Sequence, residues 1–120
     1  NTTLARPEEL PRRFAEEKGG LSGPFVKDKS NAVIAQFYSY TDGRIPIIGV
    51  GGISSGQDAL EKILAGASLV QLYTGLVFEG PGLPKRICED LATRLKTYGF
   101  ANVADAVGAE VDEALARAAA

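Results

Sequence analysis

Two short apolar runs, separated by a segment long enough for one helix, limit the folds open to this chain more than any other feature. The runs are RIPIIGV, residues 44 to 50, and SLVQLYTG, residues 68 to 75. A short continuous apolar run is typical of a strand that is buried on both faces of a parallel sheet. We therefore expect residues 45 to 50 and 69 to 73 to form adjacent parallel strands, joined by a right-handed helical crossover.

The segment between the two runs has the pattern of an amphipathic helix. Ser54 and Gln57 stand at the spacing of a capping box, and Gly66 suits the C-terminal end of the helix. Apolar residues that recur at helical spacing predict one buried face, made of Leu60, Ile63, Leu64 and Ala67.

Further helices are predicted before and after this unit. Ser30 is a candidate N-cap for a helix over residues 31 to 41. The inward face of that helix would carry Val33, Ile34, Phe37 and Tyr38. A longer amphipathic helix precedes Gly99. The resulting order of loop, helix, strand, helix, strand and helix indicates a parallel α/β architecture.

Chain length then decides how much of such an architecture is present. The chain has 120 residues, whereas a complete (β/α)8 barrel takes about 250. A parallel sheet of two or three strands is too small to stand alone with both faces covered. We therefore expect residues 1–120 to be the C-terminal portion of a TIM (β/α)8 barrel whose earlier strands lie outside this chain.

The stretch IPIIGVGGISSG, residues 45 to 56, predicts a ligand site at the end of the first strand. Glycines there would let the backbone approach a ligand and adopt positive φ. The helix that follows would add the positive end of its dipole, so a phosphate is the expected guest. In barrels, the loops after the last two strands often build such a site. The alternative is that GVGG only makes a tight turn.

Three other segments are candidates for the same site. GGLSG, residues 19 to 23, would be either a second ligand loop or a flexible surface loop. An Asn amide such as that of Asn1 can pair with both a donor and an acceptor of a planar ligand. Tyr73, at the end of the second strand, would otherwise be an aromatic core residue with a satisfied hydroxyl.

Composition narrows the chemistry that these residues could perform. A net charge of −2 gives no basic footprint for nucleic acid, and no metal site is expected. The chain has no histidine, so a proton transfer would need another residue type or another part of the protein. The most apolar stretch, residues 63 to 78, is interrupted by polar residues and is shorter than the ~20 residues of a spanning helix.

Taken together, these motifs resemble the C-terminal part of dihydroorotate dehydrogenase. The similarity is carried by NTT, GGLSG, the block IPIIGVGGISSGQDALEKILAGASLVQLYTGLVFEGP and the tail GFANVADAVGA. It runs over nearly all of the chain except its C-terminal end. Within that family, LVQLYTGLVFEGP and the tail look like the quinone-linked, membrane-associated class 2.

The resemblance implies an FMN flavoprotein that oxidises dihydroorotate to orotate in pyrimidine (UMP) biosynthesis and passes electrons to a quinone. It also implies peripheral attachment to an inner membrane through an N-terminal region absent from this chain. That membrane would be the mitochondrial inner membrane in a eukaryote and the cytoplasmic membrane in a bacterium.

Residue by residue, the resemblance assigns substrate binding to Asn1 and Thr2. It assigns cofactor binding to four residues of the glycine loops and the second strand end: Gly23, Gly52, Tyr73 and Thr74. The catalytic serine of the family falls before residue 1, so no catalytic residue is expected in this chain. The chain alone should therefore be inactive.

Two alternatives stay open. Pro24 and Phe25 follow GGLSG, where the quinone-linked class usually has a basic or small residue and then Pro. This makes the loop locally closer to the NAD-linked soluble class of the same reaction. The second alternative is a non-catalytic, phosphate-binding half-barrel that folds only by pairing with another chain.

Overall fold

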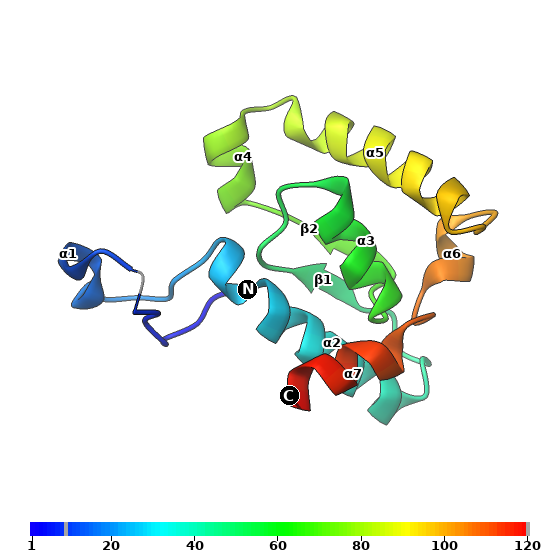
Figure 1. Cartoon of the computed structure of the whole chain (residues 1–120), viewed down its shortest axis with the longest axis horizontal. Helices are drawn as coiled ribbons and strands as arrows, with labels where there is room; N and C mark the ends of the chain where they lie inside the picture. Colours follow the sequence, from blue (N-terminus) through cyan, green and yellow to red (C-terminus); the bar gives the residue numbers. More distant parts are fainter. Residues whose placement is uncertain (9, 120) are drawn as a thin grey trace.

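A two-stranded parallel sheet lies at the centre of the computed structural model, which describes residues 1–8 and 10–119 (Figure 1). Strand β1 (Ile48–Val50) and strand β2 (Leu69–Gln71) pair so that Gly49 lies opposite Val70. Helix α3 (Gly56–Leu64) connects them. The predicted pair of adjacent parallel strands joined by a helix is thus confirmed, with strands shorter than expected.

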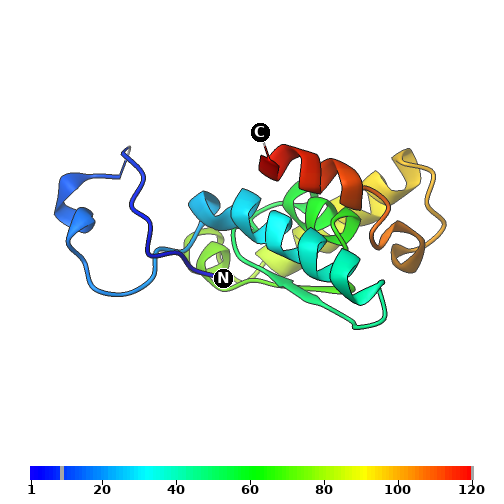
Figure 2. The same ribbon diagram turned by 90° about the horizontal axis from the view of Figure 1, so that it is seen from below.

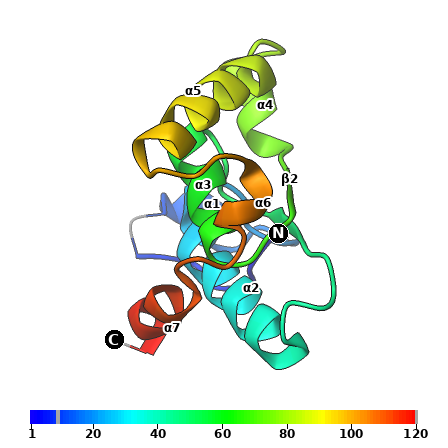
Figure 3. The same cartoon turned by 90° about the vertical axis from the view of Figure 1, so that its right-hand side faces the viewer.

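Most of the remaining chain is helical. In chain order the other elements are α1 (Arg12–Ala15), a short 3-10 helix η1 (Pro24–Val26), α2 (Lys27–Thr41), α4 (Thr74–Glu79), α5 (Leu83–Thr97), α6 (Val103–Ala106) and α7 (Val111–Ala119). Seen end-on, α5, α3, α2 and α7 follow one another across the molecule (Figure 3). Within the part of the chain that the structure describes, none of these helices is long and apolar enough to cross a bilayer.

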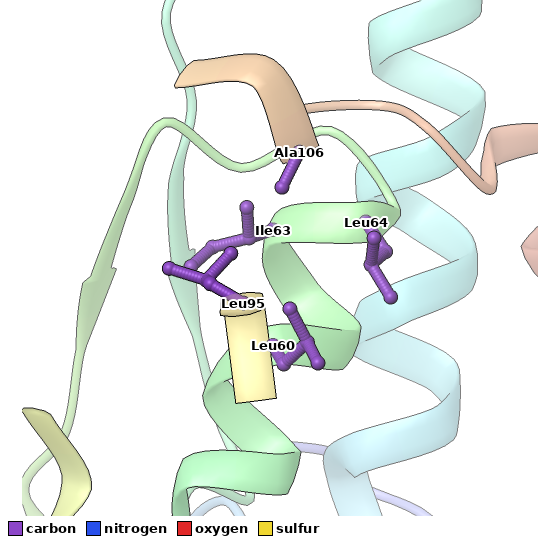
Figure 4. Packing of buried hydrophobic residues seen from close by; sticks show 5 residues of the cluster. All are labelled: Leu60, Ile63, Leu64, Leu95 and Ala106. Carbon is purple, nitrogen blue, oxygen red and sulfur yellow. The ribbon is translucent and has the colours of Figure 1, made fainter. Parts of the chain in front are cut away.

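The core forms where α3 packs between its neighbours. Its predicted apolar face is buried, and one cluster joins it to α5 and α6 through Leu60, Ile63, Leu64, Leu95 and Ala106 (Figure 4). A second cluster joins α2, the end of α3 and α7, and a third joins α3 to α5. Val70 of β2 packs against the first and third clusters, so the helices cover one face of the sheet.

The opposite face of the sheet is open, and the prediction of strands buried on both faces is therefore wrong for this chain. Ile48 is 55% exposed and Leu69 is 64% exposed, although they are paired across the two strands. The reason is that α2, α3 and α5 all lie on one side. In a closed barrel, the open face is the one that would turn inward.

Helix α2 begins earlier than predicted, at Lys27 rather than after Ser30. Ser30 lies inside the helix, and its hydroxyl donates to the carbonyl of Val50 at 2.6 Å instead of capping. The buried face also differs, because Ile34 and Ala35 are buried while Val33 and Phe37 are exposed.

The N-terminus of α3 is capped one residue later than predicted. The Ser55 hydroxyl accepts the Asp58 amide at 3.1 Å, so the capping pair is Ser55 and Asp58 instead of Ser54 and Gln57.

Residues 3–8 and 10–21 form an excursion that leaves the body of the molecule and returns to it (Figures 1 and 2). Thr3 and Leu21 close its neck by exchanging two backbone hydrogen bonds, of 2.9 and 2.8 Å. Inside the excursion, the guanidinium of Arg6 donates to the carbonyls of Glu17 and Gly19 at 2.9 and 2.7 Å. The described residues of this excursion are therefore held together mainly by backbone carbonyls that gather around one arginine.

Candidate ligand pocket at the strand ends

The turn that follows β1 has the backbone that its glycines were expected to supply. Gly51 and Gly52 have φ of 106° and 71°, the left-handed region that side chains disfavour. A Cβ at Gly51 would lie 3.3 Å from the Asn1 Cα, and one at Gly52 would lie 2.7 Å from the Lys27 Cβ. The missing side chains therefore make room for the protein's own Asn1 and Lys27, in addition to any ligand.

The second glycine loop lies beside the end of β2. Gly23 has φ of 93°, with no atom in the way of a Cβ. The hydroxyls of Ser22 and Thr74 are 2.8 Å apart, which ties this loop to the first residue of α4. Tyr73 is 78% exposed, so the alternative of a core aromatic is wrong for this chain.

The N-terminal residues reach the same place because the neck of the excursion holds them. Thr3 pairs with Leu21, which leaves Thr2 against Gly20 and Asn1 against Gly51. A side chain at Gly20 would collide with the Thr2 hydroxyl. The closeness of Thr2 therefore explains why Gly20, for which the sequence suggested no role, is a glycine.

All six residues singled out in the sequence line one cavity of about 750 Å³, a volume within the ~300–1,000 Å³ of small-molecule sites. Its walls come from the N-terminus, the GGLSG loop, the turn after β1 and the start of α4. The lining includes Asn1, Thr2, Gly23, Gly52, Tyr73 and Thr74, and also Ser22, Phe25, Ile53, Gly75 and Phe78.

Amides without a protein acceptor belong to residues that line the cavity, in the turn after β1 and at the start of α4. No hydrogen-bond acceptor within residues 1–8 and 10–119 takes the amides of Gly52, Ile53, Thr74 or Gly75. By contrast, the Ser54 amide already donates to the carboxylate of Asp58 at 3.1 Å. The amides of Ser54 and Asp58 are thus taken by side chains of the same segment, and no residue of α3 lines the cavity, so the expectation that its dipole would serve a ligand there is not supported.

Sequence reasoning missed two kinds of contributor. Ser22 was quoted within GGLSG, but only Gly23 was given a role. Phe78 belongs to α4, a helix that was not predicted because residues 74 to 79 continue the apolar run of β2 without a polar face.

Comparison with known proteins decides the family. The family profile described as "Dihydroorotate dehydrogenase" matches residues 1–95. The chain belongs to the dihydroorotate dehydrogenase family. A relative from Xanthobacter autotrophicus named "Dihydroorotate dehydrogenase (quinone)" is 57% identical over 111 residues, which cover 92% of this chain and 31% of the relative. One from Mus musculus, named "Dihydroorotate dehydrogenase (quinone), mitochondrial", is 54% identical over 92% of this chain and 28% of its own length.

Solved structures of dihydroorotate dehydrogenase agree with the fold. The ligand-free enzyme from Eimeria tenella superposes with a TM-score of 0.87 at 41% identity, and the match covers 92% of this chain and 31% of that one. The expected fold class, α/β as part of a TIM barrel, is therefore confirmed. The chain spans about a third of the length of these dihydroorotate dehydrogenases.

Proposed function

We propose that this chain supplies the FMN-phosphate site and part of the substrate site of a quinone-linked dihydroorotate dehydrogenase, which oxidises dihydroorotate to orotate in pyrimidine (UMP) biosynthesis. The observation that carries the proposal is the single cavity in which both glycine loops and the Tyr73–Thr74 strand end meet. It supports a phosphate site because the turn after β1 and the Tyr73–Thr74 end follow two adjacent parallel strands.

The chemistry of the cavity fits the phosphate of FMN. Free amides of Gly52, Ile53, Thr74 and Gly75, together with the Thr74 hydroxyl, are hydrogen-bond donors without formal charge. Gly23, whose loop is tied to Thr74 through Ser22, has open space around its Cα, and Tyr73 presents an exposed ring. Bound there, FMN would supply the hydride acceptor and the route for electrons to the quinone.

Substrate binding is proposed for Asn1 and Thr2. Both line the cavity, and the Asn1 amide can donate and accept, as a polar planar substrate such as dihydroorotate requires. Catalytic residues are proposed to lie outside this chain. Residues 1–120 alone should therefore be inactive.

Partners and location follow from the relatives' names. Quinone as electron acceptor is proposed because the relatives are named for it. Peripheral attachment to an inner membrane, mitochondrial or bacterial, is proposed through a region outside this chain.

The NAD-linked class is the second candidate, because Pro24 and Phe25 form η1 at the edge of the cavity where the quinone-linked class usually differs. The non-catalytic half-barrel is the third, because the open sheet face could pair with another chain.

A chimera tests these proposals. The 111-residue segment of this chain would replace the matching segment of the Xanthobacter autotrophicus enzyme. Flavin absorbance after gel filtration and dihydroorotate oxidation with a quinone are expected, and a colourless, folded chimera would argue for the non-catalytic alternative. Reduction of NAD in place of the quinone would instead support the NAD-linked class.

A further inference from the structure

The carboxylate of Asp58 collects four hydrogen-bond donors. One oxygen accepts the Ser54 amide and hydroxyl, both at 3.1 Å, and the Ser55 hydroxyl at 2.8 Å. The other oxygen accepts the ammonium of Lys27 at 3.1 Å. Burial, which leaves Asp58 9% exposed, would raise the pKa of this carboxyl, but the bonds from Ser55, Ser54 and Lys27 hold it below its usual range. Asp58 is therefore ionised at neutral pH.

Lys27 touches the glycine turn with its backbone as well as through this ion pair. Its Cα would lie 2.9 Å from a Cβ built at Gly52, so the two backbones are packed directly together. Its ammonium also lies 3.3 Å from the carboxylate of Glu61. Lys27 is the first residue of α2 and directly follows η1, which connects it to Gly23.

The ion pair thus joins two walls of the cavity. Gly23 and Phe25 line it on the Lys27 side, and Gly52 and Ser54 line it on the Asp58 side. Neither Lys27 nor Asp58 lines the cavity itself. We propose that Lys27 and Asp58 are positioning residues, whose ion pair fixes the turn of residues 51–54 against the loop of residues 22–25. The part of the inference that concerns FMN rests on the proposed function, because the amides of Gly52 and Ile53 in this turn are among those proposed to hold the FMN phosphate.

The alternative role for the pair is to hold α2 and α3 together. If this were its role, breaking the pair would lower the global stability of a variant but would not change how often the turn opens in the folded protein. Hydrogen exchange separates the two roles, because it reports local opening of a segment apart from global unfolding.

The first measurement is hydrogen exchange of the Ser54 amide in the flavin-free chimera, because this amide of the turn donates to the carboxylate of Asp58 and so reports opening of the turn. Lys27→Met should speed exchange of this amide roughly tenfold, the change that loss of one charged hydrogen bond produces. Asp58→Asn weakens the acceptor of the amide directly and should speed its exchange at least as much. Lys27→Arg keeps the charge and should restore most of the protection. Glu61→Gln, the matched control, removes the other partner of Lys27 without touching the turn and should leave exchange there unchanged. Unchanged exchange in Lys27→Met would overturn the proposal, even if Asp58→Asn failed to fold.

The second measurement is the affinity of the same variants for FMN. Each single variant should bind FMN roughly tenfold more weakly, and the double variant should bind no more weakly than either one, because both changes break the same contact. Additive losses would show that the two residues act separately and would refute the ion pair as the positioning element. A wild-type chimera that binds no flavin would contradict the proposed function, and hydrogen exchange would still decide the role of the pair.

Discussion

The ammonium nitrogen of Lys62 lies 2.8 Å from the side-chain oxygen of Asn31, and this bond joins α3 to α2. The same nitrogen donates to the Ser30 hydroxyl at 3.1 Å, and Lys62 is 0% exposed. No carboxylate within the described residues forms an ion pair with it. A buried ammonium is therefore held by neutral oxygens beneath the sheet.

The first prediction concerns stability against pH. Burial lowers the pKa of Lys62 from 10.5 to about 8, although the charges of Asp58, Glu61 and Asp28 oppose this and that of Lys27 adds to it. Below pH 8 Lys62 is protonated in both the folded and the unfolded chain, so folding carries the full cost of burying its charge. Between pH 8 and 10.5 the unfolded chain holds more protons, so the contribution of this site to stability rises with pH, by about 3 kcal/mol in all.

The check is to compare wild type with Lys62→Met by urea unfolding of the chimera from pH 7 to 10.5. As the pH rises, the free energy of unfolding of wild type should increase relative to that of Lys62→Met. Leu60→Met, a neutral change on the same helix, provides the baseline. A difference that stays constant with pH would show that Lys62 does not titrate in this range.

The second prediction concerns Gly52. Gly52→Ala adds a Cβ 2.7 Å from that of Lys27 to a residue with φ of 71°. Gly99→Ala has a similar φ of 84° and open space around it, so it carries only the backbone strain of about 1–2 kcal/mol. Gly52→Ala should cost more in thermal unfolding and should also weaken FMN retention, which Gly99→Ala should not. Equal effects of the two changes on flavin content would remove Gly52 from the site.

The third prediction concerns the hydroxyl contact between Ser22 and Thr74. Ser22→Ala and Thr74→Val should each weaken FMN binding, and a double-mutant cycle should give a coupling of roughly 0.5–1.5 kcal/mol, typical of one hydrogen bond. Thr93→Val is the control, because Thr93 bonds only its own helix, at Glu89. Zero coupling would mean that the two hydroxyls contribute independently.

The fourth prediction concerns Arg6. Arg6→Ala removes the donors to Glu17 and Gly19, so proteolysis within residues 10 to 20 should become faster while the unfolding temperature hardly changes. Arg12→Ala, an exposed arginine in the same excursion, should leave the cleavage rate as it is. A large drop in unfolding temperature for Arg6→Ala would show that the excursion supports the core.

The fifth prediction concerns residues 1–120 expressed alone. Because Ile48 and Leu69 are exposed across the sheet, the isolated chain should bind a hydrophobic dye and unfold without a sharp transition. It should not oxidise dihydroorotate with added FMN. Turnover close to that of the chimera would contradict the proposal that the catalytic residues lie elsewhere.

The parts that could be predicted from the sequence are those set by local periodicity. The apolar face of α3 and the two parallel strands follow from spacing that no distant contact overrides. The start of α2 could not be predicted in this way, because Ser30 is committed to Val50 and Lys62, which lie far along the chain. A side chain with a distant partner is not available as a cap.

In the candidate site, too, the features set by local sequence could be predicted and those set by distant contacts could not. Its glycines could be found because positive φ leaves a mark in the sequence. The ion pair of Lys27 and Asp58 could not, because their 31-residue separation is bridged only by the packing of α2 on α3.

Because Thr3 and Leu21 close the neck of the excursion, the excursion can change in length without changing the arrangement of the rest of the chain. Among the described residues, none from 3 to 8 or from 10 to 21 lines the cavity. Doubling a flexible loop costs only about 0.6 kcal/mol in closure entropy. The excursion is therefore a place where a tag, a reporter domain or an evolutionary insertion can enter the barrel wall while Asn1 and Thr2 stay in register with the glycine turn.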